Sequence, residues 1–181
     1  MVSLLIFLIL LWLFYIGYSR GILLQSFYFI GALVSLFVAK NHYQSLAQKI
    51  ALWVPYSNPI EGTKMAFFKD VNVFELGKVY YAGIAFIAIF LLVYGIVRLI
   101  GVFVHFFPTD YFTDIKYQII SGVLAVFVGM MVFSMIFSVL ATIPMPAVQE
   151  QLSHHFLVNV LVAHCPPMTS LIHYLWIDQV I

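Results

Sequence analysis

The first 39 residues carry a single charged side chain, Arg20, and this feature constrains the chain more than any other. Two uncharged, apolar stretches, residues 2–18 and 22–39, flank it on either side of the sequence Gly17-Tyr18-Ser19-Arg20-Gly21. A helix needs about 20 apolar residues to cross a hydrocarbon core about 30 Å thick. The pattern therefore predicts two transmembrane helices joined at a tight bend that is formed by Gly17, Arg20 and Gly21.

The composition supports a membrane protein throughout the chain. Apolar residues make up 64% of the 181 residues and charged residues only 8%, whereas soluble domains carry about 25% charged residues. The surplus of apolar side chains must face lipid. The net charge of +1 and the lack of a Lys/Arg cluster give no support for nucleic-acid binding. No Lys or Arg precedes the first apolar run, which is longer than a signal core, so we expect a retained helix.

Two later stretches also have the length and character of membrane spans, residues 79–104 and 119–143. Three amphipathic segments are expected to lie on the membrane surface: residues 40–54, 147–163 and 168–177. For residues 40–54, an extension of the second helix into water is the alternative. The sequence thus predicts an all-α integral membrane protein with four transmembrane helices plus short amphipathic interfacial helices, forming one domain over residues 1–181.

Small residues recur at every fourth position in two of the predicted spans. They are Gly31, Ser35 and Ala39 in the second span and Ser121, Ala125 and Gly129 in the fourth, where Gly122 lies beside them. Such a smooth face lets another helix approach closely, and close packing drives helix association in lipid. We expect the small face of the fourth span to meet the second helix. The alternative is that small residues are simply common in membrane helices.

Five side chains near the C-terminus are of types that bind zinc or copper: His154, His155, His164, Cys165 and His173. Their spacing matches no known ligand pattern. A Cys165 nucleophile paired with His164 would need a third, orienting group, and no span contains the acidic pair of a proton relay. We therefore expect no catalytic residue, no metal site and no cofactor, and we expect that the protein is not an enzyme.

The orientation of the chain in the membrane stays open. Arg20, Arg98 and Lys116 mark one side of the predicted bundle. The other side is marked by five lysines: Lys40, Lys49, Lys64, Lys69 and Lys78. The positive-inside rule favours the lysine-rich side as cytoplasmic, whereas the very short bend at Arg20 favours the reverse. Arg98 is interpreted as an end anchor that snorkels to water.

Several motifs resemble the colicin V production protein (CvpA) family. The run from Ile16 to Gln25, continuing to Gly31 and Ala39, resembles the family's opening helix, its Gly-x-x-Arg-Gly bend and its second helix with a central glycine. Four further stretches resemble a loop of members from Gram-positive bacteria, the start of the third span and the C-terminal part: residues 52–56, 80–86, 143–149 and 175–176. One departure is that Ala125 follows Gly122, where family members carry closely spaced glycines.

The resemblance implies a multi-pass protein of the bacterial cytoplasmic (inner) membrane that supports the production or export of a bacteriocin, a colicin V-like toxin, and envelope integrity. Two hypotheses about its mechanism stay open. The first is a scaffold that binds other membrane proteins, or itself as a homo-oligomer, through its small-residue faces. The second is a small oligomeric pore or transporter subunit. It is supported by Arg20, Arg98 and the polar stripe Ser134, Ser138 and Thr142 of the fourth span. The lipid bilayer is the one partner common to both hypotheses.

Overall fold

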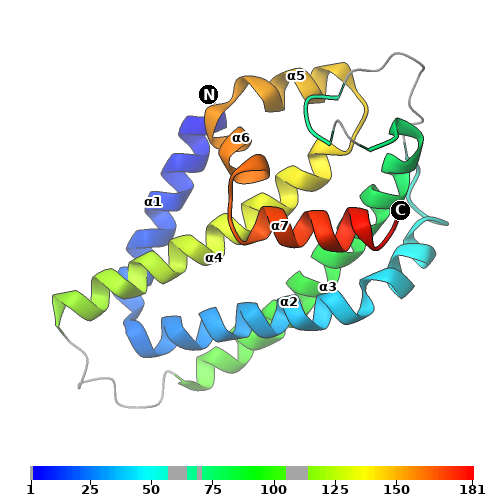
Figure 1. The fold of residues 1–181 in the computed structure, drawn as a ribbon. Coiled ribbons are helices and arrows are strands. Elements are labelled where there is room, and N and C mark those ends of the chain that lie inside the picture. Colours follow the sequence, from blue (N-terminus) through cyan, green and yellow to red (C-terminus); the bar gives the residue numbers. More distant parts are fainter. Residues whose placement is uncertain (1, 57–64, 69–70, 105–113) are drawn as a thin grey trace. The chain divides into compact units, whose positions relative to one another are not determined.

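The computed structural model describes residues 2–56, 65–68, 71–104 and 114–181. These residues form helices and connecting segments and contain no strand, which confirms the all-α class (Figure 1). The elements are α1 (Val2–Arg20), α2 (Ile22–Ile50), the 3₁₀ turn η1 (Val73–Glu75), α3 (Leu76–Val104), α4 (Ile115–Ala141), α5 (Pro146–His154), α6 (Phe156–Ala163), α7 (Met168–Ile172) and the π-helical turn η3 (His173–Asp178).

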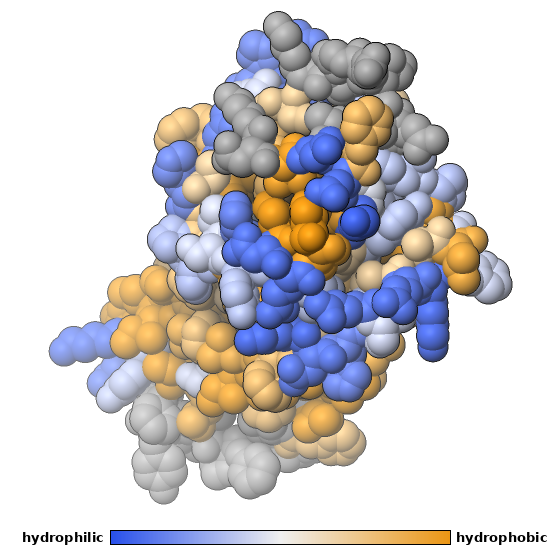
Figure 2. Space-filling model, turned by 45° about the vertical axis from the view of Figure 1, so that its right-hand side comes forward, coloured by the Kyte–Doolittle hydropathy of each residue, from blue (hydrophilic) through white to orange (hydrophobic). Residues whose placement is uncertain are grey.

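Four helices of the described chain, α1 to α4, are long and apolar enough to cross a membrane. Their outward side chains are apolar as well: in α1, for example, Leu4, Trp12 and Tyr15 are each about two-thirds exposed. Figure 2 shows the result as broad hydrophobic areas on the surface. Water would strongly disfavour such areas, whereas lipid chains cover them. The protein is therefore a multi-pass membrane protein, as predicted from its sequence.

The second helix does not stop where the sequence suggested. The prediction of a separate surface helix over residues 40–54 is wrong, because α2 runs without a break from Ile22 to Ile50. The alternative, an extension of the second helix, is what forms. The reason is local: no Gly or Pro separates Ala39 from Ile50, so nothing ends the ladder of backbone hydrogen bonds.

The C-terminal part also differs from the expected surface helices. The predicted helix over residues 147–163 is two helices, α5 and α6, because His155 between them is extended (φ −103°, ψ 111°). The segment 168–177 forms α7 and η3, and its apolar residues are buried within the protein: Met168, Ile172, Leu175, Trp176 and Ile177. The apolar face of this segment therefore packs on the protein itself, and its position at the membrane surface stays a prediction. By length and apolar character α6 and the α7–η3 helix, bent by 58°, would together also suffice for a span.

The chain forms two compact units, where the sequence suggested a single domain. Unit 1 comprises residues 1–39 and 89–131, and unit 2 comprises residues 40–88 and 132–181. Each unit therefore combines parts of α2, α3 and α4 with segments of its own.

In unit 1 the small residues of α4 meet α1. A Cβ atom added to Gly17 would lie 2.5 Å from Ala125 Cβ and 2.8 Å from the carbonyl oxygen of Ser121. The rings and branches of α1 fill the remaining hollows of α4, where Phe14 covers Gly122 and Leu13 covers Gly129. The prediction that this face meets the second helix is therefore wrong, since the hollows of α4 accept α1 instead.

The small residues of α2 are used in unit 1 as well. Val97 of α3 lies against Gly31, and the hydroxyl of Ser35 donates a hydrogen bond to the carbonyl oxygen of Gly31 (2.7 Å). Gly21 is the one residue between α1 and α2, and its φ of +83° lies in the region that favours glycine. Both small faces are thus occupied by the chain's own helices.

Candidate functional site

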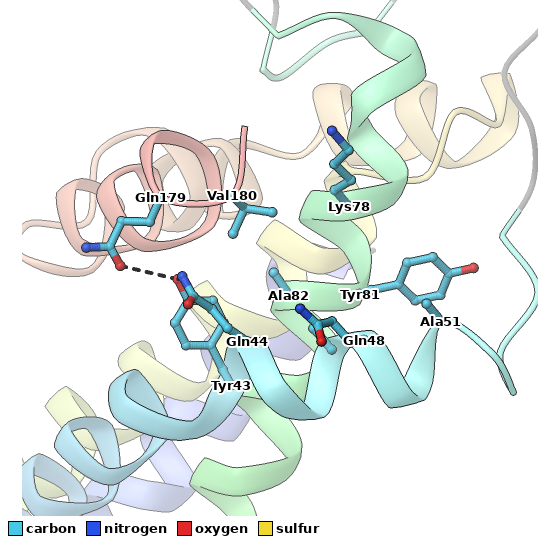
Figure 3. A pocket seen from close by; sticks show the side chains of 10 residues that line it. Tyr43, Gln44, Gln48, Ala51, Lys78, Tyr81, Ala82, Gln179 and Val180 are labelled. Carbon is cyan, nitrogen blue, oxygen red and sulfur yellow. Dashed lines mark hydrogen bonds between the residues drawn. The ribbon is translucent and has the colours of Figure 1, made fainter.

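Unit 2 contains a pocket of about 380 Å³ between the end of α2, the first turns of α3 and the last residues of the chain (Figure 3). This volume lies within the range of about 300–1,000 Å³ that is usual for ligand sites. The lining residues are Tyr43, Gln44, Ala47, Gln48, Ala51, Lys78, Tyr81, Ala82, Gln179 and Val180. Three of them are amides and one is an ammonium group, so a mostly apolar lining carries four polar side chains besides its tyrosines.

The hydroxyl of Tyr43 connects two walls of the pocket. It donates a hydrogen bond to the carbonyl oxygen of Leu175 in η3 (2.5 Å) and accepts one from Nε2 of Gln44 (3.2 Å). The amide oxygen of Gln179 approaches the same hydroxyl at 3.4 Å (Figure 3). Tyr43 is only 1% exposed, so its bonds are shielded from competing water. The end of the chain is thereby held against α2.

The η3 turn, which precedes the pocket residues Gln179 and Val180, packs on an aromatic cluster in the core of unit 2. The Phe86 ring lies edge-on to both Tyr43 and Trp176, each at 5.9 Å between centroids. Trp176 is fully buried, and a Cβ atom added to Gly83 would lie 2.9 Å from its ring. Gly83 thus provides the space for the indole. The Tyr80–Phe86 stretch was expected only to begin the third span, and its role in seating the C-terminal segment was not predicted.

Tyrosine hydroxyls fix the chain that follows α2. Tyr81 donates a hydrogen bond to the carbonyl oxygen of Val54 (2.8 Å), and Tyr56 donates one to that of Thr142 (2.7 Å). The Tyr56 ring also lies 5.1 Å from the Tyr80 ring. Burial, aided by Tyr80 and Tyr81, raises the pKa of Tyr56 to about 12. This hydroxyl therefore stays protonated, and able to donate, far above neutral pH.

Gln149 holds the corner between α4 and α5. Its Nε2 lies 2.9 Å from the carbonyl oxygens of Ala141 and Ile143, and its Oε1 accepts a hydrogen bond from the backbone N–H of Ala66 (3.0 Å). The side chain is buried, and it satisfies backbone groups that α4 leaves unpaired at its end. Ala66 is thereby held to this corner of the protein.

The pocket supplies groups for binding. Lys78 is 60% exposed and pairs with Glu75 at 3.8 Å, so its ammonium group is accessible. Gln44 and Gln48 lie one turn apart on α2, and Gln179 projects from the opposite wall (Figure 3). Amides both donate and accept hydrogen bonds, and an ammonium group donates to an anion. This set of groups suits the carboxylate and amide groups of a peptide segment.

The residues singled out from the sequence lie elsewhere. Gly17, Arg20, Gly21, Gly31, Ser35, Gly122 and Gly129 all belong to unit 1, and none lines the pocket. The pocket was missed because Gln44, Gln48 and Lys78 read as ordinary solvated positions. One signal was present: the polar face of residues 40–54 is richer in amides than in charges.

The predicted polar stripe of α4 is buried in unit 2. Ser134 donates a hydrogen bond to the carbonyl oxygen of Leu161 (2.8 Å), and Thr142, just after α4, donates to that of Val139 in the last turn of α4 (2.7 Å). Ser138 is 1% exposed and its hydroxyl has no partner within the described residues. Ser134 and Thr142 thus bond to the chain itself and do not face an open channel. Within the described residues, no three His, Cys, Asp or Glu side chains lie close enough to bind a metal ion.

Comparisons with known proteins agree with the motifs. The colicin V production protein family matches residues 2–166. An uncharacterized transmembrane protein of Bacillus subtilis (strain 168), YshB, is 27% identical over 177 residues, which cover 97% of both chains. No solved structure matches. The family match covers most of the chain, including the Gly-x-x-Arg-Gly bend, the tyrosines at the start of α3 and all of α4 to α6. The chain therefore belongs to the colicin V production protein family.

Proposed function

We propose that this protein is a scaffold of the bacterial cytoplasmic membrane that supports the production or export of a bacteriocin and the integrity of the envelope, without catalysing a reaction. It acts by holding a peptide segment of a partner membrane protein, or of a second copy of this chain, in the pocket of unit 2. The family's description, colicin V production, supports the first part. The pocket is the observation that carries the second.

The pocket replaces the small-residue faces as the binding surface of the scaffold. Gly31 is covered by Val97, Gly122 by Phe14 and Gly129 by Leu13, so these faces have no room for a further helix. The pocket, in contrast, is open and its walls are held by buried bonds such as that of Tyr43 to Leu175. A rigid, preformed site loses less entropy on binding than a mobile one.

The chemistry of the lining favours a peptide. Gln48 can donate to the carbonyl oxygen and accept from the N–H group of one residue in an extended peptide, because these two groups lie on the same side of the chain. Lys78 can pair with a carboxylate, and its own partner Glu75, at 3.8 Å and partly in water, is held too weakly to prevent this. Extended peptides present these groups at regular intervals, which sets them apart from lipid chains.

The test uses variants of the full-length protein in a strain that lacks the native copy and secretes a bacteriocin. Gln48→Leu and Lys78→Gln remove the two groups assigned to peptide binding. We expect each to lower the secreted bacteriocin several-fold and to raise detergent sensitivity, at an unchanged level of membrane protein. The matched controls are Lys49→Gln and Gln151→Leu, which change exposed residues of unit 2 outside the pocket. Equal secretion by pocket variants and controls would contradict the proposal.

A second measurement separates the scaffold from a pore. The purified protein is reconstituted into proteoliposomes, and the flux of ions and of small solutes is recorded against empty vesicles. If the protein is a scaffold, the flux from vesicles that contain it should equal the flux from empty vesicles. Flux that rises with protein content and falls in Ser138→Leu would overturn the scaffold proposal. Ser138 is suited to this test because its hydroxyl makes no hydrogen bond within the described residues, so its replacement removes no internal contact of that kind.

A further inference from the structure

Two arginine side chains of unit 1 share one aromatic ring. Arg20 ends α1, and its Cζ lies 5.5 Å from the centroid of the Tyr28 ring. The Cζ of Arg98, on α3, lies 5.1 Å from the same centroid and 5.7 Å from that of Tyr94. All three distances are within the range of about 6 Å in which a cation is attracted by a ring face. Three helices thus bring two guanidinium groups into one small region.

The shared ring is held in a fixed position. Tyr28 is 6% exposed, and its ring lies against Gly101, where any Cβ atom would collide with it. Tyr94 is 9% exposed and stacks on Phe90 at 5.7 Å. The aromatic rings therefore form a rigid support. The packing of α2 on α3 places Arg98 beside it, and the bend at Gly21 places Arg20 there.

The positive charge of this pair is not neutralised within the described residues. The ion pairs found there involve Lys78, His154 and His173, and none includes Arg20 or Arg98. Two like charges held close together repel each other, and charged groups in membrane spans are normally paired. Arg98 is exposed and Arg20 partly so, which leaves both guanidinium groups accessible from outside the bundle.

We propose that Arg20 and Arg98, supported by Tyr28, bind the phosphate group of an anionic phospholipid. A guanidinium group forms two parallel hydrogen bonds to a phosphate, and basic sites between transmembrane helices suit anionic headgroups. The depth fits as well. Arg98 lies six residues before the end of α3, about 9 Å along the helix, where a long side chain reaches the headgroup layer. Simple end anchoring would need only one arginine and no shared ring.

The test measures lipid binding by the purified full-length protein. The protein is placed in nanodiscs of phosphatidylcholine alone or with phosphatidylglycerol, and bound lipid is counted by native mass spectrometry. We expect phosphatidylglycerol to bind about tenfold more tightly than phosphatidylcholine, as for one additional charge-assisted contact. Equal binding of the two lipids would overturn the proposal. Inorganic phosphate at the same concentration should not compete, and displacement of the lipid by it would instead assign the site to free phosphate.

Variants locate the site. Arg20→Gln and Arg98→Gln should each abolish the preference for phosphatidylglycerol, and Tyr28→Phe, which keeps the ring, should retain it. Lys49→Gln removes one positive charge at the other end of α2 and should leave the preference unchanged. Thermal unfolding in phosphatidylcholine checks that each variant is folded. If Arg20→Gln is unstable, the result for Arg98→Gln decides the test, because Arg98 is exposed and its replacement should not affect folding. A preference that persists in folded Arg98→Gln, or that falls equally in Lys49→Gln, overturns the proposal.

Discussion

The indole ring of Trp176 lies directly on the backbone of Gly83, so the last helical turn of the chain depends on the absence of one side chain in α3. A Cβ atom at position 83 would lie 2.9 Å from the ring and 2.6 Å from Val139. We predict that Gly83→Ala lowers the stability by about 1–3 kcal/mol, since overpacking must displace a fully buried ring. Thermal unfolding in detergent measures this. Gly95→Ala is the control in the same helix: nothing lies within 4 Å, so it should be neutral or slightly stabilising.

The contact between Gly31 and Val97 gives a test of where the small residues of α2 act. Because Val97 would collide with a Cβ atom at position 31, Gly31→Ala should destabilise the monomer by about 1–3 kcal/mol. Adding Val97→Ala should restore at least about 1 kcal/mol of this loss, a coupling expected for residues in contact. A double variant as unstable as the sum of the single variants, or a change in oligomer mass without a change in unfolding temperature, would place this face at an intermolecular contact instead.

Two buried glutamines should respond in opposite ways to the same substitution. Gln149→Leu leaves the carbonyl oxygens of Ala141 and Ile143 and the N–H of Ala66 without their partner, and should cost about 2–3 kcal/mol. Gln25 is 3% exposed and its Oε1 has no partner in the described chain. Gln25→Leu should therefore leave the unfolding temperature unchanged or raise it. Equal losses in the two variants would contradict this account of Gln25.

The raised pKa of Tyr56 predicts a loss of stability at high pH. Burial raises this pKa from its ordinary value of 10 to about 12, so the folded state prefers the protonated hydroxyl. The resulting stabilisation is fully present below pH 10 and disappears as pH rises to about 12. Because the ring is partly exposed, we expect no more than about 1–2 kcal/mol. Unfolding temperatures measured across this window should fall less steeply for Tyr56→Phe than for the natural protein, and parallel curves would exclude Tyr56 as the cause.

Hydropathy was sufficient to predict the spans but not which helices pack together. The α4 face with Ser121, Ala125 and Gly129 would fit any neighbour, and its pairing with α1 depends on the match of Gly17, Phe14 and Leu13 to it. That match is a matter of shape, which neither composition nor periodicity encodes. For this reason the sequence could not show whether α1 or α2 packs on this face of α4, and the prediction that α2 does so was wrong.

The same limit applied to the C-terminal part and to the pocket. An amphipathic helix with a tryptophan has the same local pattern whether it lies at the membrane interface or inside the protein. Only the glycine at position 83, distant in the sequence, makes room for Trp176. Gln48 and Lys78 are unremarkable individually and gain meaning only when α2 and α3 bring them to one pocket. The bend at Gly21, in contrast, could be predicted because its signal is local.

That bend has a consequence for how the chain enters the bilayer. Because only Gly21 lies between α1 and α2, the connection is too short for one of the two helices to cross the membrane in the opposite direction while the other keeps its orientation. The beginning of α1 and the last part of α2 within unit 1, near Ala39, must therefore face the same compartment. The orientations of α1 and of the part of α2 that follows Gly21 are therefore set together when the chain inserts into the membrane.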